Sequence, residues 1–193
     1  MKKYYAMVCL IACSSSAVHG LMNNRMNDVV KKEDSGMETR IGLKAEASKN
    51  SAAILNMLLS DEYLFLTKLL KYHWNVTGPY FGSLHKLFDD QYNEVFRMVD
   101  AIAERVRSIG HKPFGTLQEF SQNSRLQESP GELPSTTEMI ADLVRGHETI
   151  ICAMREAIPD IEEQQDFGTM DFLTGLMETH EKMAWFLRAH LEK

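Results

Sequence analysis

Residues 110–134 read GHKPFGTLQEFSQNSRLQESPGELP, and they divide the chain into two stretches of helical periodicity. Prolines and glycines on both sides of a short amphipathic piece, Thr116–Phe120, break any regular helix in this segment. These breakers include Pro113, Gly115, Pro130 and Gly131. On either side, apolar residues recur at spacings of three and four, without strict alternation. The pattern predicts an all-α protein whose central connection carries one short helix.

Four apolar stripes predict four long helices. They run through Leu59, Tyr63, Leu66, Leu70 and His73; Leu84, Phe88, Val95, Val99, Ile102, Val106 and Ile109; Ile140, Leu143, His147, Ile150 and Met154; and Met170, Leu173, Met177, His180, Ala184, Leu187 and Leu191. Gly78 and Pro79 separate the first two stripes. Ser135 stands three residues before Glu138 in a capping box that starts the third helix. Pro159 is expected to end that helix. A long connection between helices two and three is typical of the ferritin-like four-helix bundle, because a short link would make them antiparallel neighbours.

The composition is that of one soluble globular domain. Of the 193 residues, 44% are hydrophobic and 25% are charged. The three cysteines, Cys9, Cys13 and Cys152, are an odd number without framework spacing, so no disulfide scaffold is expected. Cys152 is predicted to be a small buried residue of the third helix.

The formal net charge of −6 is unevenly distributed. Residues 1–50 carry 8 Lys and Arg against 5 Asp and Glu, which leaves 13 against 22, or −9, for residues 51–193. An acidic body argues against a general nucleic-acid surface and favours the attraction of cations.

The N-terminus resembles an export signal. Two lysines precede an apolar run, Tyr4 to Ala12, which is too short to span a bilayer and is followed by small residues. Residues 10–13, LIAC, resemble a lipobox, and lipidation of Cys13 would attach the protein to a membrane. Ala17 offers an ordinary cleavage site instead.

These features divide the chain into three predicted parts. Residues 1–17 are a signal or lipoprotein leader, residues 18–50 a flexible extension, and residues 51–193 the folded domain. A leader would place the protein in the bacterial cell envelope. A true start at one of the downstream methionines, Met22, Met26 or Met37, would leave it in the cytoplasm.

Two pairs of potential metal ligands lie on one face of the second predicted helix. His85 and Asp89 are spaced i, i+4, as are Asp100 and Glu104, and eleven residues separate the two pairs. At about 1.5 Å per residue, the pairs are roughly 16 Å apart along the helix, so one ion cannot touch both. Either each pair is an independent half-site, or two subunits run this helix antiparallel across a two-fold axis and complete two shared sites.

The residue types also constrain the metal. Mixed imidazole and carboxylate ligands suit ferrous iron, zinc or manganese, and His73, before the turn into the second helix, could join the first pair. No Glu-x-x-His pair is present, so a metal centre inside the bundle is not expected. The alternative is that these carboxylates form only a solvated helix face.

At these positions the sequence resembles the Dps family, the DNA-binding proteins from starved cells or miniferritins. The resemblance covers about residues 41–191. It is carried by His73-Trp74-Asn75-Val76-Thr77-Gly78-Pro79-Tyr80-Phe81, Leu84-His85, Phe88-Asp89, Asp100-Ala101-Ile102-Ala103-Glu104-Arg105, Ile109-Gly110 and Trp185-Phe186-Leu187-Arg188-Ala189.

The resemblance implies a function and a ligand set. Members form a hollow dodecamer that oxidises ferrous iron, typically with hydrogen peroxide in preference to dioxygen, and stores the ferric oxide, which protects against oxidative stress. Two irons bind at each ferroxidase centre between two-fold-related subunits. The family's ligand positions fall on His73, His85, Asp89, Asp100 and Glu104.

The resemblance suggests roles for further residues, and for Trp74 and Asp166 a structural role is the alternative. Trp74 stands where the family places an aromatic that is oxidised by escaping radicals, or it packs in the core. Asp166 and Asp171 resemble aspartates of iron-entry pores, although Asp166 is equally suited to be a helix N-cap. His147 and His180 lie on apolar stripes and are expected to be core residues.

DNA binding is the alternative function. Many family members bind DNA through a lysine-rich tail, for which Lys31, Lys32, Lys44 and Lys49 are the support here. Residues 18–50 carry 6 Lys and Arg against 5 Asp and Glu, which is nearly neutral. Because the affinity for DNA scales with the number of phosphates contacted, we expect weak binding at physiological salt.

Overall fold

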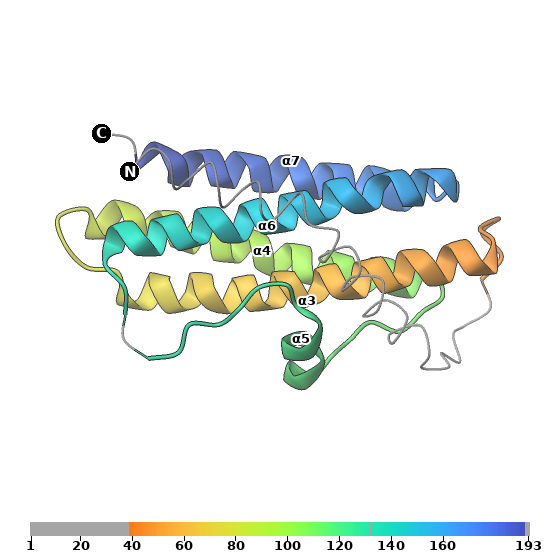
Figure 1. Ribbon diagram of the computed structural model, residues 1–193, viewed down its shortest axis with the longest axis horizontal. Helices are drawn as coiled ribbons and strands as arrows, with labels where there is room; N and C mark the ends of the chain where they lie inside the picture. The colour runs from red at the N-terminus through yellow and green to blue at the C-terminus, as the bar shows by residue number, and fades with distance from the viewer. Residues whose placement is uncertain (1–38, 132, 192–193) are drawn as a thin grey trace.

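The computed structural model describes residues 39–131 and 133–191. Within them, four long helices form a bundle and one short helix lies in the central crossover (Figure 1). The helices are α3 (Ala45–Asn75), α4 (Phe81–Ser108), α5 (Leu117–Asn123), α6 (Thr136–Glu163) and α7 (Phe167–Ala189). The described residues contain no strand. The predicted all-α, ferritin-like architecture is therefore confirmed.

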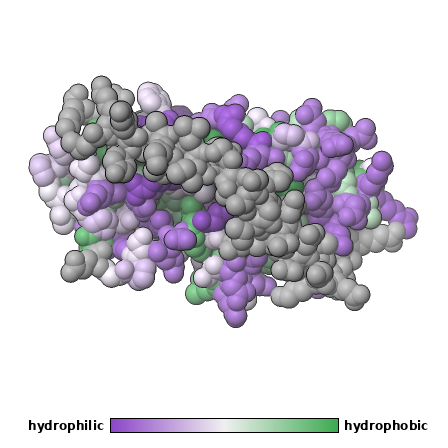
Figure 2. Space-filling view, in the orientation of Figure 1, coloured by the Kyte–Doolittle hydropathy of each residue, from purple (hydrophilic) through white to green (hydrophobic). Residues whose placement is uncertain are grey.

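The core lies where the four predicted stripes face one another. Helix α3 packs on α4, α6 and α5, and α7 packs on α6. Every residue of the second predicted stripe, which runs along α4 to Ile109 at its end, is buried except Val99, which is half-buried. Hydrophilic residues cover much of the visible surface, with apolar residues between them (Figure 2). No helix among the described residues is both long and apolar enough to cross a membrane.

A buried carboxylate holds the crossover against α3. Asp61 is fully buried and accepts hydrogen bonds from the Ser124 hydroxyl, at 3.0 Å, and from the Arg125 backbone N–H. The Arg125 guanidinium also forms an ion pair with it. Nearby, the Tyr63 ring stacks on that of Phe120, with centroids 4.3 Å apart. These contacts explain why the outer side of α3, like its inner side, is buried along much of its length.

The C-terminal half of α3 is tied to α6 through Asp142. Its carboxylate accepts hydrogen bonds from Lys68 Nζ at 3.0 Å and from the Tyr72 hydroxyl at 2.9 Å. The pKa of Asp142 is lowered because the attraction of Lys68 and these hydrogen bonds outweigh the effect of burial, which alone would raise it. The contact fixes the helical turn that directly precedes His73.

Helix α3 begins earlier than the predicted folded domain. It starts at Ala45, six residues before position 51, and Ala47 and Ser48 are buried. The Ser48 hydroxyl donates to the Ile109 carbonyl at 2.7 Å, which ties this first turn to the end of α4. The sequence pattern missed these residues because they are small or polar and form no apolar stripe. The part of the predicted extension from residue 45 onward therefore belongs to the bundle.

The prediction that the third helix ends at Pro159 is wrong. Helix α6 continues through Pro159 to Glu163. Proline removes one hydrogen bond, to the carbonyl four residues earlier, but only a single turn remains after it. Ile161, which is fully buried, holds that turn in the core. The helix ends where Gln165 adopts a left-handed backbone conformation, with φ of 63°.

The remaining expectations concern the starts of two helices, the burial of Cys152 and the N-terminal residues. The Ser135–Glu138 capping box is present at the start of α6. The crossover helix extends to Asn123 and starts with a second capping box, between Thr116 and Glu119. Cys152 is half-buried rather than fully buried. The predicted leader, including Cys13 and Ala17, lies outside the described residues, as do Lys31 and Lys32.

We predict that Asp61→Ala lowers the free energy of unfolding by about 3–5 kcal/mol, because it leaves the Arg125 cation without its buried partner. Urea unfolding at a fixed protein concentration measures the effect. Asp160→Ala, a change at an exposed position of α6, is the matched control and should stay within about 0.5 kcal/mol of the wild type. Equal stabilities of the two variants would contradict the role of Asp61 as the anchor of the crossover.

Candidate metal centre

His73 and His85 form a stacked pair at the α3–α4 turn. Their ring centroids are 3.9 Å apart and their planes are inclined by 18°. His73 Nδ1 lies 3.0 Å from the His85 carbonyl oxygen, and His85 Nδ1 lies 2.9 Å from the His73 carbonyl oxygen. A carbonyl oxygen can only accept, so each Nδ1 must carry the proton and donate it. In the neutral form of each ring the lone pair is then on Nε2, the arrangement that a metal ion requires.

The turn between the helices brings these two histidines together. Helix α3 ends where the Val76 N–H donates to the Tyr72 carbonyl, at 2.9 Å. Gly78 follows with φ of 101°, a conformation that a residue with a side chain rarely adopts. The Phe81 N–H then donates to the Gly78 carbonyl at 3.0 Å, and α4 begins. The chain thus reverses within a few residues and places His73 beside His85.

Asp89 adds a carboxylate one turn further along α4, and Tyr92 supports it. The Asp89 carboxylate lies close enough to the Tyr92 hydroxyl to raise the pKa of Tyr92 above its ordinary value. The Tyr92 ring also meets that of His73 edge-on, with centroids 5.1 Å apart. Tyr92 thus touches two predicted ligands. Our sequence reasoning missed it, although its position three residues after Asp89 places it on the same helix face.

Asp100 and Glu104 lie on the exposed surface of the same helix, three turns further on. The neighbouring Arg105 points elsewhere: its guanidinium donates to Thr169 Oγ1 at 3.1 Å and to Asp166 at 3.0 Å. Within the described residues, no three His, Cys, Asp or Glu side chains are grouped so that they could hold a metal ion. The chain by itself thus brings His73 and His85 together and leaves Asp89 one helical turn away and the second pair three turns further on. The sharing of the site between subunits stays a prediction.

The structure distinguishes between the two roles considered for Asp166. Only 4% of Asp166 is exposed, and its carboxylate accepts from the Thr169 backbone N–H at 3.1 Å as the N-cap of α7. Burial alone would raise its pKa, but hydrogen bonds, chiefly from Thr169, and the charge of Arg105 lower it. Asp166 therefore acts as a helix cap in this chain. Asp171 is exposed on α7, and its predicted place in a pore stays untested.

Trp74 is not a core residue. Its side chain is 69% exposed beside His73, so core packing does not account for it. Its predicted oxidation by radicals stays a prediction. By contrast, His147 and His180 are fully buried, as expected from their stripes.

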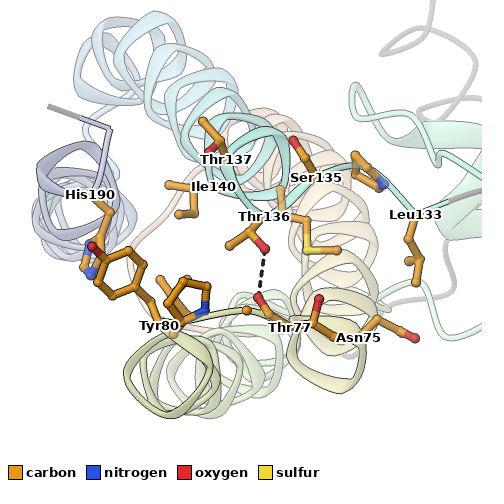
Figure 3. A pocket seen from close by; sticks show the side chains of 14 residues that line it. Asn75, Thr77, Tyr80, Leu133, Ser135, Thr136, Thr137, Ile140 and His190 are labelled. Atoms are coloured by element: carbon orange, nitrogen blue, oxygen red, sulfur yellow. Dashed lines mark hydrogen bonds between the residues drawn. The ribbon is translucent and has the colours of Figure 1, made fainter. Parts of the chain in front are cut away.

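A pocket of about 880 Å³ opens near the metal-ligand turn but contains none of the predicted ligands. It lies between the α3–α4 turn, the start of α6 and the end of α7, and Figure 3 shows Tyr80, Thr136 and His190 around it. The Thr136 hydroxyl donates to the Thr77 carbonyl across it, at 3.1 Å.

Comparison with known proteins shows the structural class to which this chain belongs. Residues 52–193 match the family model of the ferritin-like domain. An uncharacterized low temperature-induced protein of Nostoc is 47% identical over 153 residues, which are 79% of this chain and 86% of that protein. DNA protection during starvation protein 2 of Bacillus anthracis is 33% identical over 147 residues, 76% of this chain and 99% of that protein.

Solved structures identify the family within that class. DpsC from Streptomyces coelicolor superposes with a TM-score of 0.80 at 28% identity, covering 82% of this chain and 92% of that one. A Dps protein from Vibrio cholerae, described as a member of a broad superfamily of ferritin-like diiron-carboxylate proteins, gives 0.76 at 25% identity, covering 82% and 99%. The chain belongs to the Dps family of ferritin-like proteins, the miniferritins.

We predict that Tyr92→Phe weakens binding of Co²⁺ to the assembled protein by about 10- to 100-fold, the usual effect of removing a group that orients a metal ligand. A titration followed by the visible absorption of Co²⁺ measures it. Tyr63→Phe, which removes a hydroxyl from the ring stacked on Phe120, is the control and should leave the affinity unchanged. An unchanged affinity in the Tyr92 variant would show that the phenol does not orient Asp89.

Proposed function

We propose that this protein oxidises ferrous iron at centres shared by two subunits and stores the ferric product inside a hollow homo-oligomer, a dodecamer. The observation that carries the proposal is the reciprocal hydrogen bonding of His73 and His85. With Nδ1 engaged, Nε2 of each neutral ring is the atom left to bind a metal ion, and Asp89 follows His85 by one turn of the same helix. Membership of the Dps family supports iron as the substrate.

The spacing along α4 supports an arrangement in which the site is shared across the subunit interface. Two copies of α4 that run antiparallel across a two-fold axis would place His73, His85 and Asp89 opposite Asp100 and Glu104 of the partner subunit. The symmetry then generates two identical sites per dimer. Exposure of Asp100 and Glu104 in the single chain fits this arrangement, because both carboxylates remain available to a partner.

The donor set suits a pair of ferrous ions. Two neutral imidazoles and three carboxylates provide a charge of −3 for two ions that together carry +4, and mixed nitrogen and oxygen ligands are suited to Fe²⁺. Each ion gives up one electron. Hydrogen peroxide accepts both electrons and two protons and leaves as two water molecules, so no hydroxyl radical is released.

Supply of the substrate is favoured by the charge of the protein. Residues 51–193 carry a formal charge of −9, which raises the local concentration of cations around the bundle. Asp171, exposed near the start of α7, would contribute to an acidic entry route for iron. Asp166 would support that route only indirectly, by capping the helix that carries Asp171.

A complementation experiment tests whether the site is shared. One variant carries His85→Ala and Asp89→Ala, and the other carries Asp100→Ala and Glu104→Ala. We expect each variant alone to lose rapid oxidation of ferrous iron by hydrogen peroxide. In a mixed dimer, one of the two sites then combines two intact halves and the other combines two damaged halves.

Random mixing makes half of the dimers mixed, with one of two sites intact, so about a quarter of the wild-type activity should return. Stopped-flow absorbance of the ferric product measures the rate after the two variants are unfolded, mixed and reassembled. Each variant mixed with itself is the control for reassembly. No recovery in the mixture, with intact oligomers, would contradict a shared site. Full activity in the first variant alone would contradict the proposed function itself.

DNA binding is expected to be weak in spite of the names of several relatives. Proteins from Bacillus anthracis and Brevibacillus brevis are called DNA protection during starvation proteins. In this chain, the folded part is acidic and residues 18–50 are nearly neutral. We therefore predict no tight complex with duplex DNA in a gel-shift titration at physiological salt. Tight binding that survives deletion of residues 18–44 would contradict the charge argument.

A further inference from the structure

The centre of the bundle contains a polar cluster to which each long helix contributes one side chain. Its members are Glu62 of α3, Gln91 of α4, His147 of α6 and His180 of α7. Glu62 and both histidines are fully buried, and Gln91 is 3% exposed. Polar groups so deep in an apolar core are costly unless they satisfy one another. The proposed iron chemistry uses none of them.

The side chains of the cluster form a chain of contacts. Which atom donates and which accepts in each contact can be worked out from the Gln91 end. Gln91 Nε2 donates to the Met183 carbonyl at 3.1 Å, so its amide oxygen is the atom that faces His147 Nε2, at 3.4 Å. His147 Nε2 must therefore carry a proton. His147 Nδ1 is then a lone pair, and it lies 2.9 Å from His180 Nδ1, which must donate to it.

The same reasoning gives the number of protons held by His180 and Glu62, at the other end of the chain of contacts. His180 Nε2 lies 2.9 Å from a Glu62 carboxylate oxygen. If neither group carried a proton, the fully buried carboxylate would be a charge without a counter-charge. One proton on either His180 or Glu62 makes the whole cluster neutral. A second proton would give it a net positive charge in a dry core.

The surroundings favour this neutral state. The Phe65 ring packs edge-on against His147, with centroids 4.4 Å apart, and lies so close to Gly146 that a side chain there would collide with it. Burial, together with nearby His180 and Arg188, holds the pKa of His147 well below its ordinary value. Arg188 itself pairs with Glu148 at 3.1 Å. Helix α4 contributes the neutral Gln91 to the cluster.

A metal ion explains the cluster less well. Neither oxygen of Glu62 has a hydrogen-bond partner in good geometry, nor has His180 Nε2, which leaves two residues as possible ligands. His147 approaches His180 from the opposite side of its ring, at Nδ1, and so cannot join them. The described residues offer no group of three ligands here. A divalent cation held by a single carboxylate would also leave a buried positive charge.

We propose that this cluster is a proton-binding site that retains one proton per subunit, shared by Glu62 and His180, and that makes the stability of the fold depend on pH. In the unfolded chain at pH 8, the carboxylate is ionised and both imidazoles are neutral, so the three groups hold no proton. Below about pH 6.5 both imidazoles are protonated in the unfolded chain, which then holds two.

The sign of the pH dependence follows from this count. Below about pH 6.5, the unfolded state binds one proton more than the folded cluster, so stability falls as the pH falls. Above that value, the folded cluster binds one proton more, so stability falls as the pH rises. Each one-proton difference changes the folding equilibrium constant tenfold per pH unit. The cluster therefore makes its largest contribution near pH 6.5 and weakens the fold in mild acid.

Proton release on unfolding tests the site directly. The assembled protein, freed of metals with EDTA and dialysed, is denatured with guanidinium chloride at pH 8 in weak buffer, and a pH-stat counts the protons released. Glu62→Gln keeps the shape of a neutral carboxyl group but has no proton to lose. We expect the wild type to release one proton per subunit more than this variant. Glu178→Gln, at an exposed position of α7, should match the wild type.

Stability measurements over a range of pH provide the second readout. The ratio of folding equilibrium constants, wild type over Glu62→Gln, should rise tenfold for each unit that the pH falls between about 8 and 5. Equal proton release and a ratio independent of pH would overturn the proposal. One extra equivalent of tightly bound metal in the wild type, absent from the variant, would overturn it in favour of a cation site.

Discussion

The reciprocal contact between His73 and His85 is the constraint on which the site depends. Each ring donates from Nδ1 to the backbone carbonyl of the other residue, so the contact fixes the turn, the ring planes and the tautomers at once. A metal centre built on flexible side chains must order them when the ion binds, at a cost in conformational entropy. Here folding already orders the two imidazole side chains, because their rings are stacked on each other before a metal ion binds.

Several features around this pair serve to keep it in place. Asp142 ties the preceding turn of α3 to α6 through Lys68 and Tyr72. The α3–α4 turn depends on Gly78, whose positive φ a larger residue would adopt only with strain. On the outer side of α3, Asp61 fixes the crossover by accepting from Ser124 and Arg125. On α4, the predicted ligands His85 and Asp89 are half-buried and Asp100 and Glu104 are exposed, whereas the opposite face forms the core.

The sequence predicted the helices correctly wherever apolar residues marked one face of a helix. The stripes predicted all four long helices, and the Gly78-Pro79 and Ser135–Glu138 signals located two of their boundaries. Prediction failed where small or polar residues carry the packing, as at residues 45–50, and where tertiary burial of Ile161 overrode the tendency of Pro159 to end a helix. Local spacing contains no information about either effect.

The sequence likewise predicted only part of the candidate site. Spacing on one helix grouped His85 with Asp89 and Asp100 with Glu104, and it also excluded a single ion bound by all four. The stacking of His73 on His85 and the support from Tyr92 depend on how α3 and α4 pack, so they emerged only from the structure. Glu62 and Gln91 gave no signal, because an isolated polar residue in a helix is ordinarily read as part of its solvated side.

The exposed position of Asp100 and Glu104 has a consequence for how the protein matures in the cell. On the proposed arrangement, a newly synthesised subunit has half of each of two sites and binds iron too weakly to oxidise it. Chemistry would begin only when α4 meets its counterpart, so a single subunit would not oxidise iron that it has no means of enclosing. Subunit pairing, rather than the supply of iron, would then be the event that switches the protein on.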